Sequence, residues 1–164
     1  MADITYTNKA TVRRAETSVS SGNGIAYKVT ALDSTIELAA SASGTTVKFG
    51  RIPSNARILV DSRIYNDDLA TSGSPTLSLG LGSVNSNLTS LATALTSGVA
   101  LSTASTANVG TMALADFASA GKQAWDLAGA SSDPGGDLDV YATVKAAATT
   151  ATGTITLALR YVVD

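Results

Sequence analysis

Apolar and polar residues alternate along much of this chain, and the alternation predicts β-strands. Leu77, Leu79 and Leu81 share one side of residues 76–82, with Ser78 and Gly80 on the other. A repeat of two residues is typical of a strand with one face in a core and one face in solvent, as in antiparallel sheet. Similar alternation predicts strands over residues 25–30, 36–40, 47–49, 56–66, 138–145 and 154–164.

Two of these segments carry the alternation furthest. In residues 56–66, Ile58, Val60 and Ile64 are expected to face inward. In the last segment, the expected inward residues are Ile155, Leu157, Leu159, Tyr161 and Val163. Turns are expected where Gly, Pro, Asp, Asn and Ser gather. These places are Asp33-Ser34, residues 41–44, residues 51–55, the loop 66–75, residues 131–137 and the loop 146–153.

The middle of the chain has a different spacing. Residues 87–95 carry apolar side chains at i, i+3, i+4 and i+7, a spacing that predicts a short helix. Ser86 or Asn87 would cap this helix, and Gly98 would end it. Two weaker expectations follow: a helical or turn-like patch over Ala113 to Ala120, and a short strand containing Gln123, Trp125 and Leu127.

The elements together predict an all-β protein. The fold most consistent with about eight strands and hairpin-length turns is an antiparallel two-sheet β-sandwich, jelly-roll-like, with one short inserted helix. This sandwich is expected over residues 23–164. Residues 1–22 are polar and are expected to form an extended N-terminal arm, with a frayed terminus as the equal alternative.

Composition narrows the possible functions. The 164 residues include no Cys and no His, which removes thiolate chemistry, disulfides and the commonest general base at neutral pH. The net charge is -2 and charged residues make up 15%, so no overall field attracts nucleic acid. Neither a signal peptide nor a membrane span is expected, so synthesis in a cytoplasm is predicted. An enzyme and a cofactor are not expected.

Four segments resemble small structural proteins of tailed-bacteriophage virions, particularly capsid decoration (cement) proteins. They are Arg51 to Ile58, Ser74 to Leu81, Ala130 to Val140 and Thr152 to Val162, and together they span roughly residues 47 to 164. The resemblance implies a virion surface protein that binds the major capsid protein and assembles as a homotrimer on a capsid lattice. It does not cover residues 1–22.

Two acidic clusters are candidate sites. Asp133, Asp137 and Asp139 flank a pair of glycines and could supply oxygen ligands to Ca²⁺, but the spacing is not that of an EF-hand and favours a solvated turn. Asn66-Asp67-Asp68 offers two neighbouring carboxylates. Paired acids that hydrolyse glycosides flank the sugar from separate positions, so a polar loop is the favoured interpretation.

Basic and aromatic residues are the candidate partner-binding groups. The arm carries Lys9, Arg13 and Arg14, which could meet an acidic surface. Arg51, Arg57 and Arg63 are expected near one sheet region, where they could bind carboxylates or remain solvated. Tyr65 and Trp125 could be interface anchors, although Trp125 is expected in the core.

These observations favour a virion structural protein that binds the outer surface of a phage capsid. The alternative is a ligand- or carbohydrate-binding β-sandwich module of a phage fibre or tail. Sugar-binding sites usually need exposed aromatic rings, and this chain has eight aromatic residues among 164: one Trp, five Tyr and two Phe.

Overall fold

The computed structural model describes residues 28–69, 73–83, 91–108, 121–145 and 151–163. Within them, the chain forms nine strands and one short helix. Their bounds are β1 Val29–Ser41, β2 Thr46–Pro53, β3 Ala56–Ile58, β4 Arg63–Asn66, β5 Thr76–Ser83, β6 Leu91–Ala100, β7 Ser105–Asn108, α1 Ala124–Leu127, β8 Asp137–Lys145 and β9 Ala151–Val163. The predicted arm lies outside the described residues.

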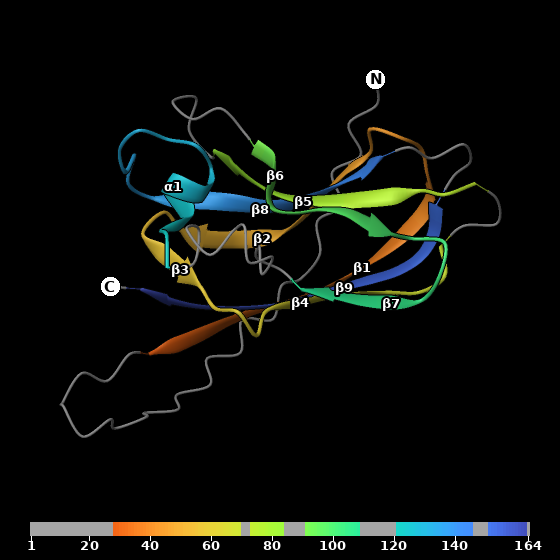
Figure 1. Cartoon of the computed structure of the whole chain (residues 1–164), viewed down its shortest axis with the longest axis horizontal. Helices are drawn as coiled ribbons and strands as arrows, with labels where there is room; N and C mark the ends of the chain where they lie inside the picture. Colours follow the sequence, from red (N-terminus) through yellow and green to blue (C-terminus); the bar gives the residue numbers. More distant parts are fainter. Residues whose placement is uncertain (1–27, 70–72, 84–90, 109–120, 146–150, 164) are drawn as a thin grey trace.

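The strands form two antiparallel sheets that pack as a sandwich (Figure 1). One sheet has the order β1-β9-β4-β7, with β3 also paired to β9, and the other has the order β2-β8-β5-β6. If β3 and β4 are counted as one interrupted strand, each sheet has four strands and the chain crosses repeatedly between them. This order is that of a jelly roll, so the predicted fold class is confirmed.

The core lies between the sheets, where the inward positions of the strands meet. Alternation predicted most of these positions correctly on β2, β5, β8 and β9. The largest fully buried side chains include Phe49, Ile52, Leu77, Leu79, Leu81, Leu138 and Ile64. Val163 was predicted to face inward but is 39% exposed, because it is the last residue of its strand.

The predicted turn at Asp33-Ser34 is wrong. β1 is one continuous strand of 13 residues that pairs with β9 through this point, where Asp33 lies opposite Ala158. The long partner strand supplies a continuous hydrogen-bonding edge, and this pairing overrides the local turn preference of Asp and Ser. The turn predicted over residues 41–44 is confirmed.

The predicted strand over residues 56–66 is interrupted. β3 pairs with β9 at Ile58 opposite Tyr161, and β4 resumes at Arg63 opposite Ala158. Four residues therefore stand opposite two, and the extra pair loops out of the ladder as in a large β-bulge. Val60, expected in the core, is consequently 56% exposed.

The helix predicted over residues 87–95 is wrong from residue 91 onward, and residues 84–90 lie outside the described residues. Residues 91–100 are strand β6, paired with β5 through an irregular register. Leu95 and Val99 are buried. Leu91 and Leu95 share one side of the predicted helix, and their spacing of four also places residues on one side of a strand, so the pattern did not separate the two.

The strand predicted around Trp125 is also wrong, because Ala124–Leu127 form helix α1. Trp125 is half-buried rather than a core residue. Its backbone N–H donates to Ser54 O at 3.0 Å, and its Nε1 donates to Gln123 Oε1 at 2.6 Å. The helix is thereby attached to the turn that follows β2. The patch predicted over Ala113 to Ala120 lies outside the described residues.

Candidate interaction surface

The structure separates the three predicted sheet arginines. Arg51 lies on β2 in the four-stranded sheet, whereas Arg57 lies on β3 and Arg63 on β4 in the five-stranded sheet. The expectation that all three share one sheet region is therefore wrong, because the chain changes sheets after β2. The predicted arm residues Lys9, Arg13 and Arg14 lie outside the described residues.

Arg51 is engaged within the chain. Its Nε lies 2.8 Å from Asp139 Oδ1, and Lys48 Nζ lies 2.5 Å from the same oxygen. Asp139 is opposite Arg51 on the neighbouring strand β8, so the register of the sheet brings the pair together. The shared carboxylate compensates part of the positive charge of this outer face.

Arg57 is also used inside the chain. Its guanidinium donates to the carbonyl oxygen of Gly121, and its backbone forms a bridge with Gln123. These contacts hold the segment before α1 against β3. Arg57 therefore has a structural use that the sequence pattern did not indicate.

Arg63 and Tyr65 differ from these residues. They lie two positions apart on β4, with the fully buried Ile64 between them, so both point away from the core. Tyr65 is 43% exposed. Within the described residues, the Arg63 guanidinium makes no ion pair or hydrogen bond. Tyr and Arg are the residue types most enriched at protein interfaces.

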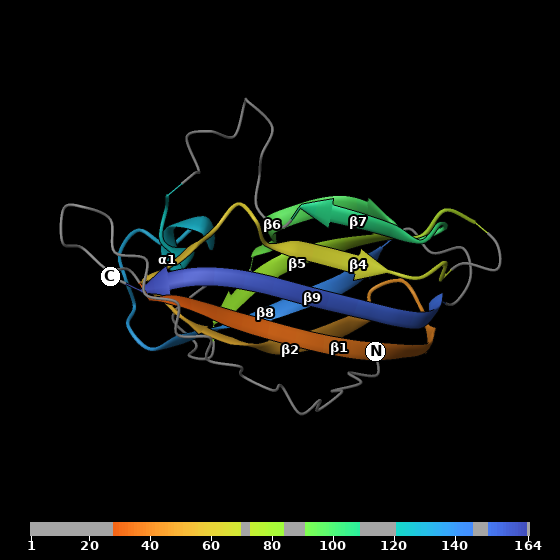
Figure 2. The same ribbon diagram turned by 90° about the horizontal axis from the view of Figure 1, so that it is seen from below.

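The surface around this pair is the outer face of the five-stranded sheet, seen from outside in Figure 2. Here it is called the outer A face and comprises Asp33, Thr35, Glu37, Arg63, Tyr65, Thr154, Thr156, Ala158 and Arg160. Hydroxyls cross-link its strands: Thr35 Oγ1 lies 2.9 Å from Thr156 Oγ1, and Thr154 Oγ1 donates to Glu37 Oε2 at 2.9 Å. Small side chains and paired groups make the face a polar platform.

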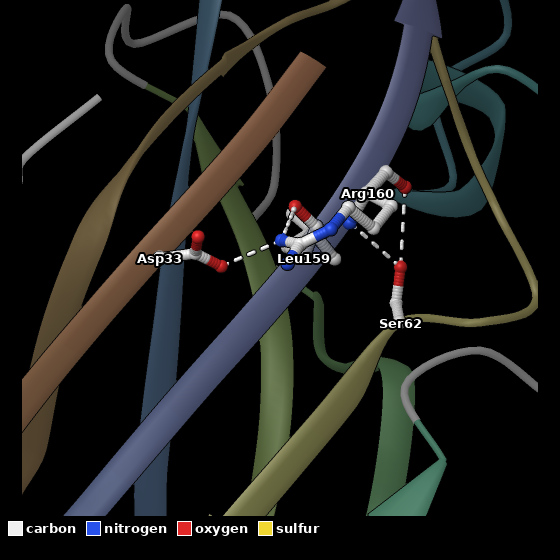
Figure 3. Close-up of polar contacts among 4 residues, drawn as sticks. All are labelled: Asp33, Ser62, Leu159 and Arg160. Atoms are coloured by element: carbon white, nitrogen blue, oxygen red, sulfur yellow. Dashed lines mark hydrogen bonds and ion pairs between the residues drawn. The ribbon is translucent and has the colours of Figure 1, made fainter. Parts of the chain in front are cut away.

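A close-up of the platform shows how its bulged end is fixed (Figure 3). Arg160 Nη1 lies 2.6 Å from Asp33 Oδ1, which joins β9 to β1. The buried Ser62 hydroxyl accepts from Arg160 N at 2.9 Å and donates to Arg160 O at 3.1 Å. Ser62 thus accepts from Arg160 N where no strand residue stands opposite, while Leu59 N also donates to Arg160 O at 2.8 Å. The N–H of Ser62 closes a turn onto Leu59 O at 3.1 Å.

The two acidic clusters take part in local structure. Asp133 Oδ1 accepts from Gly135 N at 2.9 Å, the hydrogen bond of an Asx turn, and the turn predicted over residues 131–137 is formed. Asp67 Oδ2 accepts from Thr154 N at 3.3 Å, and Asn66 Nδ2 donates to Thr103 O at 3.0 Å. These bonds tie the end of β4 and the residue after it to β9 and to the loop between β6 and β7.

The described part of the chain offers neither a metal-binding cluster nor a membrane-spanning helix. No group of three or more Asp, Glu, His or Cys side chains is arranged there to hold a metal ion. None of the helical structure there has the length and apolar character that crossing a membrane requires. The surface feature that remains is the outer A face with its exposed Tyr65 and half-buried Arg63.

Comparison with known proteins points to phage capsids. No protein-family model and no curated protein matches this sequence. A chain in the capsid of Ralstonia phage GP4 has a similar structure, with 25% identity and a TM-score of 0.58 over 83% of this chain and 84% of that one. A chain in the capsid asymmetric unit of cyanophage Pam1 shares the fold, with 21% identity and a TM-score of 0.56 over 96% and 98%. These likenesses support a phage structural protein related to capsid proteins.

Proposed function

We propose that this protein is a capsid decoration protein: it binds the outer surface of a phage shell and stabilises the shell by protein–protein contacts. The observation that carries the proposal is the structural likeness to the GP4 capsid chain over more than four-fifths of both chains. The platform of the outer A face, with the exposed Tyr65 and the half-buried Arg63, adds a surface suited to protein contacts. The partner is the major capsid protein, and the protein is made in the host cytoplasm and resides in the virion.

Shell binding is assigned first to the N-terminal arm, residues 1–22. Its basic residues Lys9, Arg13 and Arg14 would meet an acidic shell surface, so attachment should weaken as salt rises. Arg51, Arg57 and Arg63 form the second set of candidates. Arg51 and Arg57 already have partners within the chain, which leaves Arg63 the best placed of the three for an external carboxylate.

We also propose a homotrimer. Among the paired strands, β1 and β7 end one sheet, and β2 and β6 end the other. Strand edges are usually covered or blunted in native proteins, and closed symmetric assembly is a common way to cover them. Light scattering at micromolar concentration should give about three chains per particle. A monomer at every concentration, both free and on shells, would contradict this state.

Co-sedimentation with undecorated shells tests the function. The full chain should pellet with shells in a saturable, salt-sensitive manner, whereas a chain of residues 23–164 should melt at nearly the same temperature and pellet far less. If the full chain does not pellet with shells, the decoration role is wrong. If the truncated chain pellets equally well, docking lies elsewhere and Arg63→Ala is the next variant. If the truncation unfolds the domain, the arm belongs to the sandwich.

One observation favours a second function, a carbohydrate-binding module of a fibre or tail. Tyr65 is 43% exposed on the polar outer A face, and a sugar ring can stack on an exposed aromatic ring. A glycan array with the wild-type chain and with Tyr65→Ala separates the two functions. Reproducible sugar binding that Tyr65→Ala removes would favour the module over the decoration protein.

A further inference from the structure

The turn between β3 and β4, residues 59–62, carries an exposed tip. Val60 is 56% exposed and Asp61 is exposed, while Ser62 behind them is fully buried and bonded to Arg160. In Figure 1 this turn projects below the five-stranded sheet, on the side away from the other sheet. The tip is therefore a fixed projection from the outer A face.

The charges beside this tip have no partner in the described structure. Asp61 and Arg63 are two residues apart, yet neither makes an ion pair or hydrogen bond with any described residue. The nearby pair Asp33–Arg160 and the pairs on the other sheet are all satisfied internally. An acid and a base are thus both left open next to Val60 and Tyr65, two of the three exposed large hydrophobic side chains.

We propose that this turn patch (Val60, Asp61, Arg63 and Tyr65) is a two-fold contact with a second copy of the same chain. A two-fold axis brings the same patch of two subunits together, so residue i meets residue j and residue j meets residue i. Asp61 of each copy then faces Arg63 of the other, which neutralises all four charges. Val60 and Tyr65 supply the apolar surface between the two ion pairs.

This contact is distinct from the proposed trimer. A three-fold ring joins two different surfaces of each chain, whereas a self-complementary patch closes a pair. The two-fold contact would join two chains from neighbouring trimers, or two monomers if the protein forms no trimer. It rests on the geometry of the turn and does not depend on shell binding.

Charge exchange tests the proposal. Asp61→Arg and Arg63→Asp are made separately in the full chain, and the average mass is followed by sedimentation equilibrium up to millimolar concentration. Each variant alone places like charges opposite each other, so its association constant should fall by about tenfold or more. An equal mixture should recover, because one chain then carries two cations and the other two carboxylates. The double variant Asp61→Arg/Arg63→Asp should also associate like the wild type.

Asp137→Arg is the matched control, because Asp137 is exposed on the other sheet and likewise makes no ion pair with a described residue. It should leave association unchanged. Melting curves establish folding, and Asp61→Asn and Arg63→Gln serve as milder variants if an exchange unfolds the chain. Recovery in the mixture can come only from a contact between copies. The proposal is overturned if the wild type shows no concentration-dependent association, if the exchanges behave like the control, or if single exchanges weaken association and the mixture does not recover.

Discussion

The two sheets share one core but have different outer faces. On the four-stranded sheet, the outward residues of β5 are small and buried: Ser78, Gly80 and Gly82. On the five-stranded side, the strands and their turn carry all three large hydrophobic side chains that are exposed within the described residues, namely Val60, Tyr65 and Val163. Both sheets therefore bury their inner faces in the core, whereas the exposed large hydrophobic side chains of the described residues lie on one sheet alone.

The charges follow the same division. Arg51 and Lys48 on the four-stranded sheet converge on Asp139, while Asp61 and Arg63 on the other side have no partner within the described structure. Exposed ion pairs contribute little to stability, so the stability of the fold does not explain why these surface charges are paired or unpaired. The outer A face is therefore the surface on which substitutions should change binding more than stability.

The largest loss of stability should come from substitutions in the core that both sheets share. Such losses should not depend on which sheet carries the residue. Phe49 is 1% exposed and packs between the sheets. Phe49→Ala should lower the free energy of unfolding by about 3–5 kcal/mol because it removes buried surface and leaves a cavity. Urea unfolding measures this loss, with Phe49→Leu as the milder control. A loss below about 1 kcal/mol would show that this part of the core is loosely packed.

Substitution of one glycine on each sheet allows the effect of backbone strain to be compared. Gly153 on β9 has φ 137°, and a Cβ there would lie 2.5 Å from Leu69 Cδ2. Gly153→Ala should cost about 2–4 kcal/mol, since strain and overpacking add. At Gly50 on β2, an added Cβ would lie 2.8 Å from the end of the Leu32 side chain, so Gly50→Ala should cost about 1 kcal/mol. Equal losses in thermal unfolding would contradict the strain assigned to Gly153.

Two buried serines on the five-stranded sheet test how the bulge is fixed. Ser62→Ala removes both bonds to Arg160 and should cost about 1–2 kcal/mol, because Arg160 N loses its acceptor, whereas Arg160 O keeps the bond from Leu59 N. Ser34 is its matched control, since its buried hydroxyl has no hydrogen-bond partner. Ser34→Ala should therefore be neutral or slightly stabilising. The interpretation fails if the two variants unfold at the same denaturant concentration.

The smallest effect on stability is expected on the outer A face. Tyr65→Ala and Arg63→Ala should each change the free energy of unfolding by less than about 0.5 kcal/mol, because Tyr65 is exposed, Arg63 is only half-buried, and neither side chain makes an ion pair or hydrogen bond with a described residue. Both should weaken association between copies in sedimentation experiments. Lys145→Ala, on the exposed end of β8, should change neither quantity. A loss of association in that control would remove the distinction between the faces.

Sequence alternation predicted the fold class because most strands are flanked by turns and keep one phase. β5, β8 and β9 are examples, with unbroken inward positions such as Leu79, Val140 and Leu157. It could not separate strand from helix in β6, since a spacing of four fits both. Alternation also did not predict the interruption at residues 59–62. Val60 is apolar and in phase with Ile58 and Ile64, so the pattern predicted a core residue there.

The candidate site was predictable only in part. The phase set by Ile64 correctly placed Arg63 on an outward face, and the structure shows Tyr65 on the same face. Which arginines have internal partners depends on contacts distant in sequence: Asp139 is 88 residues from Arg51, and Gly121 is 64 residues from Arg57. Sheet register determines these pairs, and local pattern does not reveal it.

Electron microscopy of undecorated phage shells mixed with this protein tests the central claim most directly. The account predicts density for the sandwich outside the shell, with the outer A face and the turn of residues 59–62 in contact with a neighbouring protein chain. Density within the shell wall would contradict the decoration role. Density outside the shell in which the outer A face and its turn meet only solvent, while the four-stranded sheet makes the contacts, would contradict the assignment of the surface.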